Sequence, residues 1–434
     1  PKDAFNYGIG MIHQHFKLVD VLTAAENIVL GLPGKLDLKA ASAKIREICD
    51  KYGFSVDPAQ KIYDMSVSQK QTVEMVKVLY RGADILILDE PTAVLTPQET
   101  DKLFAVLRNM RNDGKAIVII THKMHEVEAL SDRVAILRHG QVIGDMLTAH
   151  TNAQEMTNMM VGHAVSLNIE RPDPVDPKPR IEVKGLTVRS VDGIVKLDDV
   201  SFTANSGEIL GIAGISGCGQ KELLEAIAGL QTVESGSISY IEDDGSREEL
   251  IGKDPLSIAE LGVSLSFVPE DRLGMGLVGN MNLADNMMLR SFRRGKSIFT
   301  DRRSPRALAE SVVQELSVST PSVDTPVRRL SGGNVQKVLV GREIASAPTV
   351  LLTAYAVRGL DIHSSYTIYD LINRQKKAGV AVIFVGEDLD VLLELCDRIL
   401  VLCGGKVSGI VSGRGAEKRE VGMMMTKLGG QSHE

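Results

Sequence analysis

Two adjacent carboxylates stand at the end of an apolar run in the first half of the chain. The run ILILDEP reads as a buried strand that ends in Asp89 and Glu90. Taken alone, an acid in this position usually does no more than begin a loop. In a phosphoryl-transfer site the two acids have separate tasks, because Asp89 can hold Mg²⁺ through a water and Glu90 can polarise the attacking water. The pair is therefore a candidate hydrolytic centre.

Other polar residues follow apolar runs in a way that fits the same chemistry. His122 ends the run VIITH, where it can reach a γ-phosphate, although a lone histidine there is more often an ordinary surface or core residue. Gln14, in MIHQHF, offers an amide to the metal and to the attacking water. His13 and His15 flank it, and alternating histidines of this kind more often pack than bind metal. The catalytic candidates are Glu90 and His122, and the candidate Mg²⁺ ligands are Asp89 and Gln14.

A glycine-rich stretch, GISGCGQKEL at 214–223, has the spacing of a phosphate-binding loop that leads into a helix. Its backbone N–H groups predict phosphate binding through Gly214, Gly217 and Gly219. Gln220 stands where such loops have a lysine, and Lys221 follows one place later. One residue turns a helical side chain by about 100°, so Lys221 is expected to point away from the phosphates. The stretch reads as a phosphate loop that has lost its catalytic lysine.

The chain repeats itself. MSVSQKQ at 65–71 resembles LSGGNVQ at 330–336, and SDRVAILRHG at 131–140 resembles CDRILVLCGG at 396–405, both at one offset of 265 residues. Upstream, GMIHQHF at 10–16 aligns with SFVPEDR at 266–272 at an offset of 256, so copy two carries nine more residues in the following helical region. By this offset the phosphate loop of copy one would lie about 40 residues before Pro1, and copy one is expected to lack it.

Short apolar runs alternate with helix-period stretches in both copies, which predicts an α/β fold. Residues 1–162 are expected to form the first domain. The stretch ERPDPVDPKPR is rich in proline and charge, so 163–180 is expected to be a linker. Residues 181–434 are expected to form the second domain.

Copy two has lost the polar groups that the chemistry needs. At the fixed register, Ala354 and Tyr355 replace the acid pair, Glu387 replaces the histidine and Glu270 replaces the glutamine. Each lost group contributes a few kcal/mol to the transition state, and every 1.4 kcal/mol is about tenfold in rate. Hydrolysis in copy two is therefore expected to be lost, while its glycine loop keeps the means to bind phosphate.

The acid pair, the histidine, the glutamine and the two signature-type segments resemble, in this order and spacing, the ATP-binding-cassette (ABC) ATPase family. The resemblance covers nearly all of the chain, twice. It implies two tandem P-loop NTPase domains, each with a mixed sheet core and a helical subdomain, that bind ATP and Mg²⁺.

The resemblance also implies that each domain's signature closes over the nucleotide of the other domain. Copy two keeps LSGGN, whose Ser331, Gly332 and Gly333 open a helix and can donate to a γ-phosphate. Copy one has MSVSQ, where Ser68 replaces the closing glycine and hinders close backbone approach. The intact signature of copy two would therefore face the acid pair of copy one, and the altered signature of copy one would face the altered residues of copy two. This predicts one competent composite site and one degenerate site.

Tandem domains with these signatures resemble the sugar-type importer ATPases, and GIGMIHQHFKLVDVLTAAENIVLG looks most like their nucleoside branch. The resemblance implies a membrane permease that contacts about residues 13–30, and indirectly a solute-binding lipoprotein or periplasmic receptor. It places the chain on the cytoplasmic face of the inner membrane.

The net charge of the chain, and the positions where it differs from the usual ABC ATPase motifs, bear on which other functions stay open. A net charge of −7 without a basic run argues against nucleic acid as a partner. Ala356 and Val357 replace a usual Pro-Thr pair, Val335 replaces a usual glutamine, and the chain begins at Pro1 inside an ongoing pattern. Two alternatives stay open. One is a truncated copy without activity, and the other is a soluble twin-ABC protein that takes no part in transport.

Overall fold

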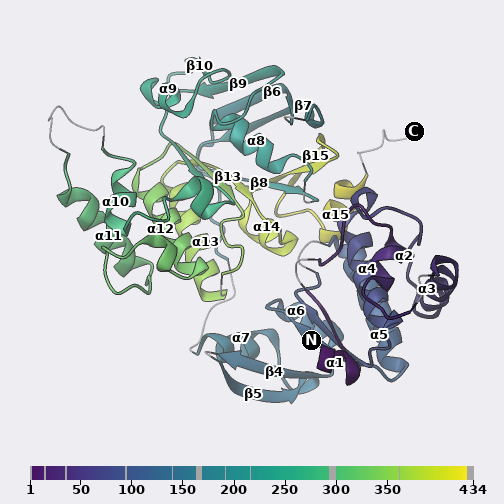
Figure 1. The fold of residues 1–434 in the computed structure, drawn as a ribbon. Coiled ribbons are helices and arrows are strands. Elements are labelled where there is room, and N and C mark those ends of the chain that lie inside the picture. The colour runs from purple at the N-terminus through teal and green to yellow at the C-terminus, as the bar shows by residue number, and fades with distance from the viewer. Residues whose placement is uncertain are drawn as a thin grey trace. The chain divides into compact units, whose positions relative to one another are not determined.

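The computed structural model describes residues 2–13, 16–34, 37–92, 95–138, 140–162, 169–190, 192–215, 217–292, 300–360 and 362–427. The chain divides into two compact units, unit 1 (Pro1–Val165) and unit 2 (Ser166–Glu434). Each unit is considered by itself below (Figure 1).

Unit 1 alternates helices and strands along the chain. Its elements are α1 (Lys2–Asn6), β1 (Ile9–Ile12), α2 (Ala24–Val29), α3 (Leu38–Tyr52), η1 (Ile62–Asp64), α4 (Val67–Tyr80), β2 (Ile85–Asp89), α5 (Pro97–Asn112), β3 (Ala116–Ile120), α6 (Met124–Leu130), β4 (Arg133–Arg138), β5 (Gln141–Leu147), η2 (Thr148–His150) and α7 (Ala153–Val161).

The strands of unit 1 form one parallel sheet, in the order β1-β2-β3, and a separate antiparallel hairpin, β4-β5. Leu86 and Leu88 of β2 are buried in a core that side chains of α4 and α5 complete. On β3, Val118 and Ile120 are about half exposed. Within the described part of unit 1, β2 is the strand that pairs with β3, and no strand runs along the other edge of β3.

Unit 2 begins with an antiparallel region and continues in the same order of elements as unit 1. Its elements are β6 (Pro179–Arg189), β7 (Val195–Asn205), β8 (Ile209–Gly214), α8 (Gln220–Ile227), β9 (Ser235–Ile241), β10 (Arg247–Glu249), α9 (Pro255–Glu260), β11 (Leu265–Val268), the π-helical turn η3 (Arg272–Gly276), α10 (Leu283–Met288), α11 (Arg303–Glu315), η4 (Val327–Arg329), α12 (Gly332–Ala345), β12 (Val350–Ala354), α13 (Ile362–Lys377), β13 (Ala381–Val385), α14 (Leu389–Leu395), β14 (Arg398–Cys403), β15 (Lys406–Ser412) and α15 (Lys418–Thr426).

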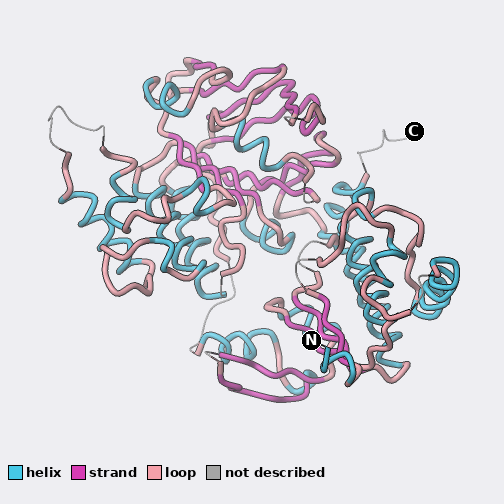
Figure 2. The backbone as a smooth tube through the Cα atoms, in the orientation of Figure 1, coloured by secondary structure: helices cyan, strands magenta, loops and turns pink. Residues whose placement is uncertain are grey.

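The central sheet of unit 2 has the strand order β11-β12-β13-β8-β14-β15, in which β14 and β15 are antiparallel and the other neighbours are parallel. A second, antiparallel sheet has the order β10-β9-β6-β7. Helices α10, α11 and α12 gather away from this second sheet (Figure 2). The predicted mixed sheet core with a helical subdomain is confirmed.

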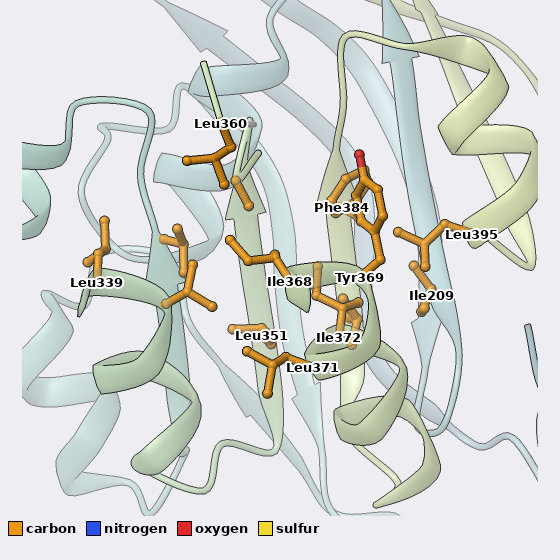
Figure 3. Close-up of a cluster of buried hydrophobic side chains, with 14 of the residues drawn as sticks. Ile209, Leu339, Leu351, Leu360, Ile368, Tyr369, Leu371, Ile372, Phe384 and Leu395 are labelled. Carbon is orange, nitrogen blue, oxygen red and sulfur yellow. The ribbon is translucent and has the colours of Figure 1, made fainter. Parts of the chain in front are cut away.

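The central strands of unit 2 are buried on both faces, which explains their continuous apolar runs. Phe384 of β13 and Leu351 of β12 pack with α12 and α13 on one face, as Figure 3 shows. Their neighbours Ile383 and Leu352 pack on the opposite face, against the second sheet and α8. The alternation fixes the register of each strand, because a slip of one residue would exchange the two faces.

The internal repeat has the register that the sequence predicts. Ile9 pairs with Ile85 in unit 1, and Leu265 pairs with Val350 in unit 2, at the two offsets found above. Asn27 bridges the backbone of Val19, and Asn286 bridges Val278 in the same way at an offset of 259. Of the nine extra residues in copy two, three therefore precede Val278, in the segment that contains η3, and six follow.

The described part of the predicted linker packs on unit 2. Ile169 is buried in the core of unit 2. The carbonyl of Glu170 accepts from Asn373 Nδ2 at 2.5 Å, and the guanidinium of Arg171 donates to the carbonyl of Cys396 at 2.7 Å. These bonds satisfy backbone groups that lack regular secondary structure. From Ile169 onward the segment thus belongs with unit 2 and is not a free connection.

Candidate functional site

The structure brings Glu90 and His122 together at one edge of the sheet of unit 1. Strands β2 and β3 are parallel neighbours, so the residues that follow them emerge at the same edge. His122 Nδ1 lies 2.9 Å from Glu90 Oε1. Both side chains are partly exposed, so a water can reach the carboxylate. Asp89 is the last residue of β2, beside them.

The backbone at Glu90 is held in an unusual conformation that both units share. Glu90 has φ +45° and its N–H donates to the carbonyl of Ile120 at 2.9 Å. Tyr355 has φ +53° and its N–H donates to Val385 at the same distance. A non-glycine residue in the left-handed region costs on the order of 1–3 kcal/mol. Since unit 2 keeps this strain after losing the acid, the turn is a requirement of the fold and not of the carboxylate.

A buried polar network that the sequence analysis missed supports the loop that carries His122. Glu126 accepts from the hydroxyl of Thr121 at 3.0 Å and also from the hydroxyl of Thr92. The hydroxyl of Thr121 in turn accepts from the backbone N–H of Lys123 at 3.1 Å. The network thus joins the loop after β2 to the loop after β3. A signal was present in the sequence, because the equivalent positions of copy two are apolar or glycine, namely Val357, Gly386 and Val391.

We expect Glu126→Ala to loosen this loop while the rest of unit 1 stays folded. The substitution leaves the buried hydroxyl of Thr92 without its carboxylate, which costs about 1–3 kcal/mol. Backbone amides of residues 121–127 should then exchange with deuterium on the order of 10- to 100-fold faster, as measured by mass spectrometry. Glu128→Ala, on the exposed side of α6, is the control and should leave these rates unchanged. Unaltered exchange in the Glu126 variant would show that the network does not hold the loop.

The residues at this edge match the way in which Mg²⁺ is bound beside phosphates. Asp89 supplies a carboxylate oxygen, which is a donor that Mg²⁺ prefers. Gln14, the other predicted ligand, lies outside the described residues. No three His, Cys, Asp or Glu side chains gather as a metal cage anywhere in the described part of the chain. Mg²⁺ in phosphoryl transfer needs one or two protein ligands besides phosphate oxygens and waters, so the donors fit that mode.

The phosphate loop of unit 2 has the backbone shape that the glycine spacing predicts. It runs from Gly214, at the end of β8, to Gly219, just before α8. Gly217 and Gly219 have φ +87° and +98°, a region open to glycine but strained for other residues. A Cβ on Gly219 would also lie 2.5 Å from the carbonyl oxygen of Lys196. The glycines are therefore required by the turn itself.

Neither polar side chain at the start of α8 takes the part of the missing lysine. Gln220 is buried and its Nε2 donates back to the carbonyl of Ile215 at 3.1 Å. Lys221 is largely exposed, and its Nζ lies 3.7 Å from Glu225 Oε1 one helical turn onward. The structure thus turns Lys221 away from the loop, as helix geometry predicts. The loop offers backbone N–H groups to a phosphate but no cationic side chain of its own.

The signature of unit 2 begins α12. Ser331 caps the helix, and its hydroxyl accepts from Asn334 Nδ2 at 2.9 Å. Gly332 and Gly333 are the first helical residues, so their N–H groups have no intrahelical acceptors. The guanidinium of Arg272 donates to the carbonyl of Gly332 at 3.1 Å and ties the signature to the segment after β11. Such a helix start presents donors and a positive dipole end to an anion.

The start of the equivalent helix in unit 1 is closed by a capping box. The hydroxyl of Ser66 accepts from the N–H of Gln69, and the Gln69 side chain accepts from the N–H of Ser66. Ser68 occupies the position of Gly333 in this turn. Unit 1 therefore keeps the helix cap but adds a side chain where unit 2 has none.

Two segments of the chain match the sequence pattern of the family described as ABC transporter. The matched residues are 2–93 and 197–353, which together make up more than half of the chain. They contain the acid pair of unit 1 and the phosphate loop and signature of unit 2. The chain belongs to the ABC transporter family, which confirms the resemblance found in its motifs.

Named relatives extend the similarity over both units. The nucleoside import ATP-binding protein NupA of Lactococcus lactis subsp. cremoris is 40% identical over 441 residues, which cover 100% of this chain and 85% of NupA. The guanosine import ATP-binding protein NupO of Bacillus subtilis is 38% identical and covers 98% of this chain and 83% of NupO. The glucose import ATP-binding protein TsgD13 of Haloferax volcanii is 37% identical, with 98% and 83% covered.

In the described part of the chain, no helix combines the length and the apolar character that are needed to cross a membrane.

Proposed function

We propose that this chain is the ATP-hydrolysing, energy-coupling subunit of an importer for nucleosides or simple sugars. In this proposal one composite site hydrolyses ATP with the acid pair of unit 1. A second site, at the phosphate loop of unit 2, binds nucleotide without hydrolysing it. The names of the relatives, which include nucleoside, guanosine and glucose import proteins, support this class of solute.

The contact between Glu90 and His122 is the observation that carries the proposal. A carboxylate 2.9 Å from an imidazole, at the carboxyl edge of a parallel sheet, is suited to orient a water and to hold its proton. Unit 2 has the same backbone there, but Tyr355 and Glu387 occupy the two positions. At this edge of the sheet, the two units therefore differ in the chemistry of their side chains and not in the backbone of the turn.

The roles of the residues follow from their placement. Glu90 would take the proton of the attacking water, and His122 would donate to the γ-phosphate. Asp89 and Gln14 would hold Mg²⁺, which when bound neutralises charge on the phosphates. Ser331, Gly332 and Gly333 would close over the nucleotide from unit 2 and complete the hydrolytic site. Closure of the two units would then move the permease between its access states.

The segment at about residues 13–30 is proposed as the contact with the permease. Three described side chains in this segment, Val19, Val21 and Leu30, are large, apolar and at least 40% exposed. Side chains of this kind suit a protein interface better than water. The receptor, a lipoprotein or a periplasmic protein, would act through the permease. The chain itself would lie at the cytoplasmic face of the membrane.

Transport-coupled ATP hydrolysis tests the proposal. The chain would be reconstituted with its permease and receptor and supplied with guanosine or ribose. We expect Mg²⁺-dependent phosphate release that rises with the solute. Asp89→Asn should remove it, because an amide holds Mg²⁺ far more weakly than a carboxylate does. Ala354→Asn, the same position in unit 2, should leave it unchanged.

The alternatives give different outcomes in the same assay. Absence of hydrolysis with the permease present would identify an inert copy. A rate of ATP hydrolysis that does not change with the permease but changes with ribosomes or DNA would identify a soluble twin-ABC protein.

A further inference from the structure

Three charged side chains meet at the carboxyl edge of the sheet of unit 2. Arg358 Nη1 lies 2.5 Å from Glu270 Oε1, and Arg358 Nε lies 3.0 Å from Glu387 Oε1. Glu270 follows β11, Arg358 follows β12 and Glu387 follows β13, so one guanidinium bridges three neighbouring connections. Each side chain is about one third or more exposed and can therefore be reached by a ligand.

The triad of Glu270, Arg358 and Glu387 occupies the positions at which a γ-phosphate and its metal ion would bind. Glu270 occupies the position of Gln14, and Glu387 occupies the position of His122. The guanidinium of Arg358 lies 5.9 Å from the ring centre of Tyr355, which replaces Glu90. Tyr355 packs against the same core cluster as Cys218 of the phosphate loop. Tyr355 also lies close enough to Cys218 for the two side chains to interact electrostatically, so Tyr355 connects the triad with the loop that would hold the first two phosphates.

The residues of this site do not fit a divalent cation. Ala354 offers no oxygen in place of the aspartate. Burial, together with the carboxylates of Glu270 and Glu387, raises the pKa of Tyr355 to about 12, so the phenol stays neutral near pH 7. A guanidinium already occupies the space between the two carboxylates, and like charges at such distances repel. The carboxylates that could have bound a metal are satisfied by arginine instead.

A third phosphate meets an equally unfavourable site. Gln220 supplies no charge at the loop, and Lys221 points away from it. The N–H donors of Arg358 are bound to two carboxylates. A phosphate would have to displace these carboxylates from Arg358 and would then be repelled by their negative charge. Nearby Arg272 directs its guanidinium to the backbone carbonyls of Gly332 and Arg358. The first two phosphates, in contrast, need the backbone N–H groups of the glycine loop, which are retained.

We propose that the phosphate loop of unit 2 takes a nucleoside diphosphate in preference to a triphosphate, and takes it without a divalent cation. The Glu270–Arg358–Glu387 triad fills the place of the third phosphate and of the metal. This inference rests on the proposed function, since it takes the loop of unit 2 to be a nucleotide site. It gives that site the specificity of a product-binding site and not that of a second ATP site.

The test uses the full chain with photoreactive 8-azido-ADP and 8-azido-ATP, and peptide mapping reports labelling in each unit separately. In unit 2 we expect half-saturation with the diphosphate at a concentration at least about tenfold lower than with the triphosphate. Chelation of Mg²⁺ with EDTA should leave that ratio unchanged.

A charge-removing variant tests the cause. Glu270→Gln combined with Glu387→Gln frees the guanidinium of Arg358, so labelling by the triphosphate should improve about tenfold or more while the diphosphate changes little. Glu310→Gln combined with Glu315→Gln removes the same charge from exposed ion pairs of α11 and serves as the control. It should leave both ligands unaffected.

Three outcomes would overturn the inference. They are tighter labelling by the triphosphate, loss of labelling with EDTA, and no labelling of unit 2 at all. The first two leave the proposed function standing as long as ATP hydrolysis depends on Asp89. The third would also overturn the proposed nucleotide site of unit 2, while hydrolysis that depends on Asp89 would still support the proposed role of unit 1. Absence of both labelling and hydrolysis would overturn the proposed function as well.

Discussion

Glu90→Gln is expected to abolish ATP turnover by the reconstituted transporter while ATP still binds. A general base contributes about 10²–10⁴-fold to a rate, and the amide of glutamine cannot accept a proton. The glutamine amide can hydrogen-bond to His122 Nδ1 in either tautomer of the imidazole, because it has both an acceptor oxygen and a donor nitrogen, so the local geometry should persist. Phosphate release would measure turnover, and retention of radiolabelled ATP on the stopped enzyme would measure binding.

The matched control for Glu90→Gln is Tyr355→Phe, the equivalent position in unit 2. Both residues have the same left-handed backbone, so both substitutions test a side chain on one kind of turn. Loss of the neutral phenol should leave turnover unchanged, because that site takes no proton. If the glutamine variant retains more than about a tenth of the turnover, Glu90 is not the base.

Gly333→Asp, in the signature of unit 2, is expected to lower the rate of ATP turnover at least about 100-fold. Positioned N–H donors are worth about 10²–10³-fold each, and an added carboxylate both covers them and repels the γ-phosphate. The fold should tolerate the change. A Cβ on Gly333 would lie 3.4 Å from Leu360 Cδ2, an ordinary contact, and an acid in the first turn of a helix favours the dipole.

Ser68→Asp supplies the comparison for the signature, because it places the same charge in the same helical turn of unit 1. That signature faces the degenerate site in the proposed arrangement, so turnover should fall far less. Equal losses in the two variants would contradict the assignment of one competent composite site. Circular dichroism and thermal unfolding would check that both variants keep the native fold.

Much of the fold could be predicted from the sequence because the chain contains two copies of the same pattern of strands and helices. The offset between the copies predicted which strands correspond, and the pairing of Ile85 with Ile9 and of Val350 with Leu265 confirms it. Side-chain direction at the start of α8 was also predictable, since a regular helix fixes the angle between Gln220 and Lys221.

The sequence did not reveal interactions that depend on side chains from separate connections. The bonds from Thr92 and Thr121 to Glu126, and the bridge from Arg358 to Glu270, join residues that only the sheet brings together. The two copies differ in sequence at these positions. Which residue each side chain contacts, however, depends on the order of the strands in the sheet and on the path of the loops. The packing of Ile169 was missed for a related reason, because proline and charge in its neighbourhood read as a free linker.

Within the described part of unit 1, β3 has no partner strand along one edge and exposes apolar side chains on one face. Val118 and Ile120 are each 49% exposed, whereas the equivalent residues of β13, Ile383 and Val385, are buried against the second sheet and α8. A strand edge that carries β-branched apolar side chains is a template to which extended segments of other molecules can add. Extended segments of other molecules would therefore add most readily at this edge of β3, and a lysine in place of Val118 would oppose such addition.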